Sequence, residues 1–104
     1  TGGRDTVAVR VPDHPVPVAL ARGLGRPITG TSANLAGQPS ALTAEDVRSG
    51  LGESVDLIID GGPVQLGTQS TIIDATGPLL KLVRLGAISL SDIRSVYQGE
   101  VVAV

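Results

Sequence analysis

The first two thirds of the chain alternate between strand-like and helix-like patterns. Short runs rich in β-branched residues, "TVAVRVP", "RPITGT" and "VDLIIDGG", are typical of strands at residues 6–12, 26–31 and 55–62. Between them, residues 13–25 and 41–52 combine an apolar face with terminal glycines, as helices do. Asp13 or His14 is the expected cap of the first helix, and Thr43 that of the second.

The last third predicts a strand pair followed by a helix. "STIIDAT" and "LLKLVRLG" read as strands at residues 70–76 and 79–86, joined by a turn at residues 76–78. Residues 89–99 predict a short helix capped by Ser89 or Ser91, and "VVAV" is a final strand or a tail. The whole pattern predicts an α/β fold with a mixed sheet, in one domain over residues 1–104.

Composition excludes several classes of function. One Tyr and no Phe or Trp leave no stacking platform for single-stranded nucleic acid, and a net charge of −2 without a basic run leaves no electrostatic footprint for it. With no Cys and one His we expect no disulfide and no transition-metal site. No apolar stretch approaches the roughly 20 residues of a membrane span, so we expect no membrane association.

Polar residues gather where the predicted strands begin or end. Thr31, Ser32 and Asn34 follow one strand. Ser70 and Thr71 open another, and Arg84 closes a third. Ligands of open α/β sheets bind outside strand ends, and a planar Arg fork suits carboxylate and phosphate. The residues by themselves therefore indicate an anion-binding α/β domain.

Each of these residues also has a purely structural interpretation. Asn34, close to Gly37, is equally consistent with turn chemistry. Arg10 either binds a ligand or pairs with a strand carboxylate such as Asp74, and Ser70 alone reads as the first residue of a strand. His14 reads as a cap. No nucleophile–base pair and no phosphate-binding P-loop motif is visible.

Four blocks, in order, resemble the Sua5/YciO/YrdC family of threonylcarbamoyl-AMP synthases: "TVAVRVPDHP", "PITGTSANLAGQPS", "STIIDAT" and "VRLG". "LTAEDV" and "DLIIDGGP" agree as well, and the resemblance is strongest over residues 5–86. It implies a YrdC-like twisted mixed sheet with flanking helices. The family's N-terminal half, with its Lys-x-Arg motif, has no counterpart here. With the Met-free start at Thr1, this predicts a fragment that holds part of the domain.

The resemblance implies an activity for the parent protein. The family joins L-threonine, bicarbonate and ATP into L-threonylcarbamoyladenylate and pyrophosphate, and the product feeds the t6A modification of tRNA. It implies ATP with Mg²⁺ as substrate and no tightly bound cofactor. It also implies a cytoplasmic enzyme that works with the t6A transferase machinery, with tRNA or double-stranded RNA as a further partner.

The resemblance also implies residue roles. By this resemblance, L-threonine would be bound by Arg10 and Ser70. ATP would be bound by Thr6, Ser32, Asn34, Ser40 and Arg84. No acid–base residue and no metal ligand is implied, because catalysis would rest on positioning and charge neutralisation. Two departures from the family pattern are Gly30, where some relatives have a threonine-binding Thr, and Leu85, where Pro is common.

Two other functions stay open. One is a diverged module that binds nucleotide or RNA without synthesis. The other is an inactive structural fragment, which predicts an exposed apolar face and self-association. Threonine-dependent release of pyrophosphate separates synthesis from both.

Overall fold

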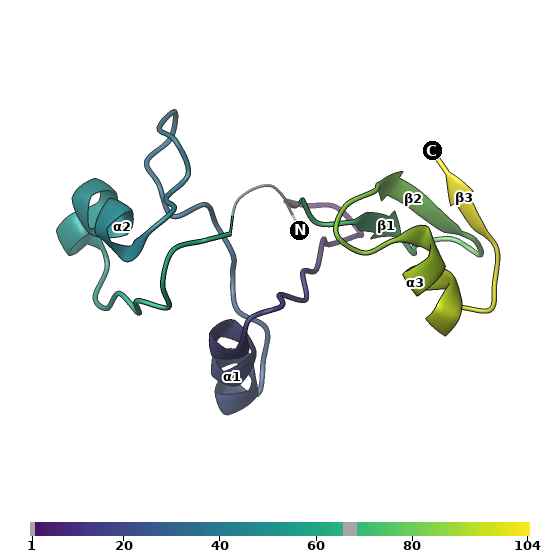
Figure 1. Cartoon of the computed structure of the whole chain (residues 1–104), viewed down its shortest axis with the longest axis horizontal. Coiled ribbons are helices and arrows are strands. Elements are labelled where there is room, and N and C mark those ends of the chain that lie inside the picture. The colour runs from purple at the N-terminus through teal and green to yellow at the C-terminus, as the bar shows by residue number, and fades with distance from the viewer. Residues whose placement is uncertain (1, 66–68) are drawn as a thin grey trace. The chain divides into compact units, whose positions relative to one another are not determined.

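A computed structural model describes residues 2–65 and 69–104 of the chain and divides it into two compact units. The helical unit is Ala8–Val64. The sheet unit comprises the described residues of Thr1–Val7 and Gln65–Val104. Figure 1 labels the helices and strands of both, and each unit is described by itself. The expectation of a single domain over residues 1–104 stays a prediction.

The first helix of the helical unit begins and ends where the sequence predicts. α1 spans Pro15–Leu24. His14 is its N-cap, and its Nδ1 accepts a hydrogen bond of 3.2 Å from the backbone N–H of Val16. Gly25 ends the helix at φ 69°, in the left-handed region that glycine adopts without strain. The interpretation of His14 as a cap is therefore confirmed.

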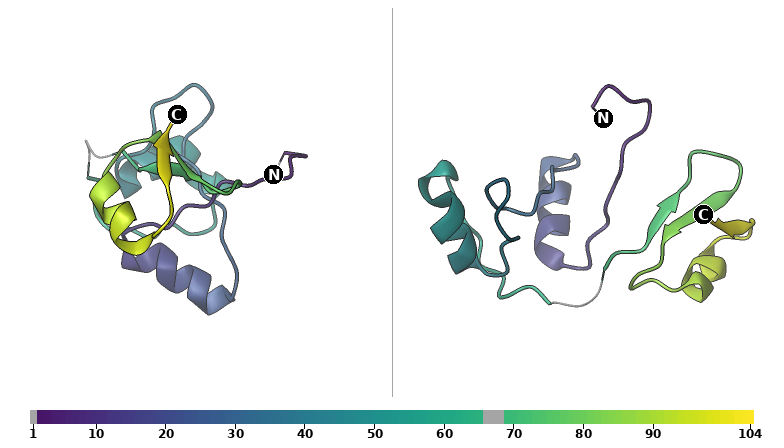
Figure 2. Two further views of the ribbon diagram at one scale, coloured as in Figure 1. Left: turned by 90° about the vertical axis from the view of Figure 1, so that its right-hand side faces the viewer. Right: turned by 90° about the horizontal axis from the view of Figure 1, so that it is seen from above.

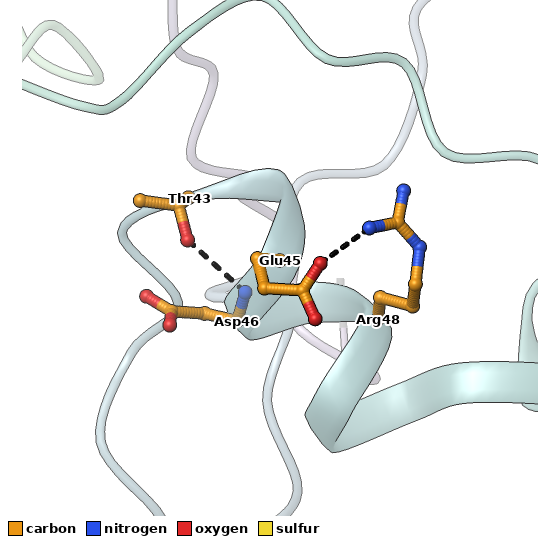
Figure 3. A network of polar contacts seen from close by, with 4 residues as sticks. All are labelled: Thr43, Glu45, Asp46 and Arg48. Atoms are coloured by element: carbon orange, nitrogen blue, oxygen red, sulfur yellow. Dashed lines mark hydrogen bonds and ion pairs between the residues drawn. The ribbon is translucent and has the colours of Figure 1, made fainter.

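The second helix is also defined by its cap. α2 spans Ala44–Leu51 and continues into the short 3₁₀ turn η1, Gly52–Ser54. The Thr43 hydroxyl accepts a hydrogen bond of 3.0 Å from the backbone N–H of Asp46, as Figure 3 shows. Glu45, in the first turn, pairs with Arg48 one turn later. A hydroxyl cap and acidic residues in the first turn both stabilise the positive end of a helix.

The sheet unit contains a three-stranded mixed sheet. Its strands are β1 (Ile72–Asp74), β2 (Leu80–Arg84) and β3 (Val101–Ala103), in the spatial order β1-β2-β3. β1 and β2 are antiparallel, whereas β2 and β3 are parallel and connected through the helix α3, Leu90–Val96 (Figures 1 and 2). Parallel neighbours need such a crossover. Helices with a mixed sheet confirm the predicted α/β class.

α3 supplies the apolar centre of this unit. Ser89 and Asp92 form a capping box, in which each side chain bonds to the backbone N–H of the other. Ile93, 7% exposed, is the one side chain in the described part of the chain that is buried. The hydrophobic core is therefore small.

Three predicted strands carry no strand structure. Residues 6–12, 26–31 and 55–62 are irregular, and most of their apolar side chains are exposed, for example Val9 at 79% and Leu57 at 78%. A β-branched sequence becomes a strand only when a neighbouring chain supplies hydrogen-bond partners, and within residues 2–65 and 69–104 none pairs with these segments. The prediction of strands there is wrong for this structure.

No helix among the described residues is long and apolar enough to cross a membrane.

Candidate functional site

A compact loop follows residues 26–31 in the helical unit. The Thr31 hydroxyl accepts a hydrogen bond of 3.1 Å from the N–H of Ala33, which has a left-handed φ of 55°. The Ala41 N–H donates to the carbonyl of Ser32, 3.3 Å away, and so closes the loop. A non-glycine residue at positive φ is uncommon, which indicates that the surrounding hydrogen bonds hold this loop in one conformation.

Asn34 organises the interior of the loop. Its side-chain Nδ2 donates to the carbonyls of Leu35 (2.8 Å) and Gln38 (2.9 Å). These two bonds use both hydrogens of the amide. Its Oδ1 is buried and accepts no hydrogen bond from the described residues. The turn-forming role of Asn34 is thus present in the structure, while its buried Oδ1 has no hydrogen-bond partner among the described residues.

A hollow of about 370 Å³ opens beside this loop. Asn34 and Ser40 line it from the loop, and Asp46 and Ser49 line it from α2. Asp46 is held in place, because its Oδ2 accepts a hydrogen bond of 3.0 Å from the Leu42 N–H while its own N–H donates to Thr43. The cap of α2 therefore also shapes this hollow.

The sheet unit brings two further candidate residues together. Ser70 lies two residues before β1, and Arg84 is the last residue of β2. The Nε of Arg84 donates a hydrogen bond of 3.0 Å to the carbonyl of Ser70. Both residues are exposed, and in the described part of the chain no acceptor bonds to Nη1 or Nη2 of Arg84. The described residues therefore leave the end of this guanidinium open to an anion.

Thr6 and Arg10 make no comparable contacts with the described residues. Both are exposed, and neither side chain forms a hydrogen bond or ion pair with the described residues. Thr6 belongs to the sheet unit and Arg10 to the helical unit. The predicted pairing of Arg10 with Asp74 joins the two units and stays a prediction. Asp74 itself accepts hydrogen bonds from the N–H (2.9 Å) and hydroxyl (2.7 Å) of Thr76.

The candidate residues thus form two groups. Ser32, Asn34 and Ser40 share the loop of the helical unit, whereas Ser70 and Arg84 meet in the sheet unit. Sequence reasoning named Thr71 only as one of the polar residues at strand ends and gave it no separate role, although its hydroxyl makes three hydrogen bonds in the sheet unit. The only signal in the sequence was its position beside Ser70 at the start of a predicted strand.

Comparison with known proteins places the chain in a family. The Sua5/YciO/YrdC family model, described as "Telomere recombination", matches residues 1–86. The threonylcarbamoyl-AMP synthase of Bacillus subtilis is 43% identical over 96 residues, which are 92% of this chain and 28% of that protein. The Pyrococcus abyssi synthase is 42% identical over 97% of this chain and 29% of its own length. The Schizosaccharomyces pombe synthase is 38% identical over 91% of this chain and 23% of its own length.

This chain therefore spans less than a third of the length of these three relatives. No solved structure matches it. The family model covers well over half of the chain, and its match begins before the loop of the helical unit and ends at the turn after β2. The chain belongs to the Sua5/YciO/YrdC family.

Proposed function

We propose that this chain is part of a threonylcarbamoyl-AMP synthase, which uses L-threonine, bicarbonate and ATP to make L-threonylcarbamoyladenylate and pyrophosphate for the t6A modification of tRNA. The identity of about two in five residues to proteins named as threonylcarbamoyl-AMP synthases supports the reaction. The contact between Arg84 and Ser70 carries the proposal on the structural side, since it gathers two of the implied ligand residues from separate strand ends.

Arg84 is assigned to ATP. Its Nε is occupied by the Ser70 carbonyl, so the guanidinium presents the two Nη groups end-on to a ligand. Two parallel N–H donors match two oxygens of a phosphate, and charge-assisted bonds of this kind are about twice as strong as neutral ones. The Ser70 hydroxyl and the Arg10 guanidinium are assigned to L-threonine, where Arg10 would bind the carboxylate.

The loop of the helical unit is assigned to the nucleotide as well. Ser32 and Ser40 offer hydroxyl donors, and Ser40 faces the hollow. Asn34 has no amide hydrogen left for a phosphate, and phosphate oxygens cannot pair with its Oδ1, because both are acceptors. Because Oδ1 is buried, we assign Asn34 to the ATP site as the residue that holds this loop in shape. Thr6 is a further ATP contact.

Mg²⁺ accompanies ATP as part of the substrate and is held mainly by phosphate and water oxygens. We further propose that the enzyme acts in the cytoplasm and passes its product to the t6A transferase machinery, with tRNA or double-stranded RNA as a further partner.

The first experiment measures pyrophosphate release with ATP, Mg²⁺ and bicarbonate, with and without L-threonine. It compares the 104-residue chain with the polypeptide of the complete reading frame, whatever its length. We expect threonine-dependent release from the latter. Arg84→Gln should reduce it strongly, whereas Arg48→Gln, which alters an exposed ion pair of α2, should leave it unchanged.

Two results would contradict the proposal. Nucleotide or RNA binding without threonine-dependent release would favour a diverged binding module. Neither binding nor release, together with self-association of the chain, would favour an inactive structural fragment.

A further inference from the structure

One side chain, that of Thr71, hydrogen-bonds the residues before β1 to the turn after β2, at Gly86 and Ile88. The hydroxyl of Thr71 donates a hydrogen bond of 2.6 Å to the carbonyl of Ile88. It accepts hydrogen bonds from the N–H of Gly86 (2.9 Å) and from the N–H of Ile88 (3.1 Å). A hydroxyl has one donor and two acceptor positions, so the capacity of this one is fully used inside the protein.

The backbone at the same place is packed tightly. The Ala87 N–H donates to the carbonyl of Gln69 at 2.8 Å. A Cβ on Gly86 would lie 2.2 Å from that carbonyl oxygen and 2.6 Å from the N of Thr71, distances that no side chain tolerates. The absence of a side chain at Gly86 therefore permits the close approach, and the Thr71 hydroxyl holds it.

These contacts lie next to Arg84. Arg84 is two residues before Gly86, and the carbonyl that its Nε contacts belongs to Ser70, the residue before Thr71. Strand pairing alone does not fix the end of β2 at Arg84. Arg84 pairs with Ile72, and the β1–β2 register shifts directly beside this pair, between Ile72 and Ile73. A bulge disrupts regular pairing at such a point.

We propose that Thr71 is a positioning residue for Arg84. Its hydroxyl holds the Gly86 turn against the residues before β1, so that the Ser70 carbonyl binds Nε and the two Nη groups point end-on at the anionic part of a ligand. Thr71 itself touches no ligand, because its hydroxyl has no bonding capacity left. That ATP is the ligand rests on the function proposed above, whereas the geometry of Arg84 does not.

The test compares Thr71→Val, which keeps the shape and loses the hydroxyl, with Thr71→Ser, which keeps the hydroxyl. The first readout is hydrogen exchange of the Arg84 Nε–H by NMR, and the second is the Kd for ATP with Mg²⁺. In Thr71→Val we expect exchange to accelerate and the Kd to rise, each about three- to tenfold, as the loss of the hydrogen bond between the Arg84 Nε–H and the Ser70 carbonyl predicts. Thr71→Ser should stay within about twofold of wild type, since one hydroxyl is conserved.

The inference is overturned if Thr71→Val keeps the wild-type exchange of the Arg84 Nε–H, whether or not ATP binds. If the wild-type polypeptide of the complete reading frame binds no ATP, the proposed function fails, and the exchange comparison still decides the role of Thr71. The Tyr97 N–H, bonded to the Ile93 carbonyl at 2.9 Å in α3, reports folding. If Thr71→Val also loses protection at the Tyr97 N–H, the variant does not fold, and the inference is then tested in the wild type by the exchange rate of the Thr71 hydroxyl proton. A slowly exchanging Thr71 hydroxyl proton supports the inference, and a rapidly exchanging one contradicts it.

Discussion

The segments 70–86 and 6–12 have similar β-branched sequences and opposite outcomes. In the sheet unit, β1 and β2 pair with each other, and β2 also pairs with β3. In residues 6–12 the alternating Val7, Val9 and Val11 are 65%, 79% and 88% exposed, and no described residue pairs with them. The difference teaches that β-propensity reports a fit to a pleated, half-buried surface and does not create that surface.

The helices show no such contrast between the units. α1, α2 and α3 all begin at a residue that accepts a hydrogen bond from the first turn: His14, Thr43 and Ser89. Hydrogen bonds of a helix are made within the segment, so its ends are determined by nearby residues. The two units therefore differ in their strands, which need distant hydrogen-bond partners, and not in their helices.

The largest expected effect contrasts the buried side chain with an exposed one. Ile93→Ala should lower the free energy of unfolding by about 2 to 3 kcal/mol, because it removes buried methylene groups and leaves a cavity. Val9→Ala should change it by less than about 0.5 kcal/mol, because Val9 is 79% exposed. Urea unfolding followed by circular dichroism measures both. Equal losses would mean that Val9 is buried in solution, which would break the contrast.

A second prediction concerns the close approach beside β1. Gly86→Ala should destabilise the sheet unit by about 1 to 3 kcal/mol, because the new methyl group forces the backbone apart. Gly77→Ala is the matched control in the same unit, since a Cβ there meets nothing within 4 Å. Amide hydrogen exchange of β1 and β2 resolves the two effects. Wild-type protection in Gly86→Ala would contradict the packing described here.

A third prediction sharpens the contrast within the helical unit. Thr43→Ala should reduce the stability of α2 by about 1 kcal/mol, since the cap of the Asp46 N–H is lost. Glu45→Gln breaks the exposed ion pair with Arg48 and should cost less than about 0.5 kcal/mol. Exchange rates of the α2 amides measure both changes. A larger loss from Glu45→Gln would show that the cap does not control this helix.

The smallest expected effect is a pH dependence of the sheet unit. Hydrogen bonds from the Thr76 side chain and backbone lower the pKa of Asp74 below its ordinary value of 3.8, and bonds from Ser89 lower the pKa of Asp92 likewise. Folded carboxyls that titrate at lower pH than unfolded ones add stability above that ordinary value, and this stability is lost as pH falls through the folded pKa.

Urea midpoints recorded between pH 6 and pH 2.5 measure this loss, with Asp92→Asn as the control. The variant cannot titrate at residue 92, so its midpoint should fall less steeply with acid than that of wild type. Identical slopes would mean that the Ser89–Asp92 capping box does not persist in solution.

The sequence placed candidate residues at strand ends and in a hydroxyl-rich loop, and their roles in ligand binding stay predictions. The sequence pointed to Ser32, Asn34, Ser40, Ser70 and Arg84, and the structure groups the first three in one loop and the last two in one contact. The sequence could not show that the Nδ2 of Asn34 donates to two loop carbonyls while its Oδ1 has no partner among the described residues. It also could not single out Thr71. Those roles depend on the path of Leu35–Gln38 and on Gly86–Ile88, 15 to 17 residues away from Thr71.

By itself the sequence determined the three helices, the Thr43 cap, the β1–β2 pair and the family, because each rests on neighbouring residues or on residue identity. It left two candidate caps for each of the other helices, and the structure selects His14 and Ser89. Only the tertiary structure decided which strand-like segments become strands, and that the Ser70 carbonyl orients Arg84. Strand pairing and the contacts of Thr71 join residues far apart in the chain, and a local pattern states what a segment prefers without stating which distant atoms will satisfy it.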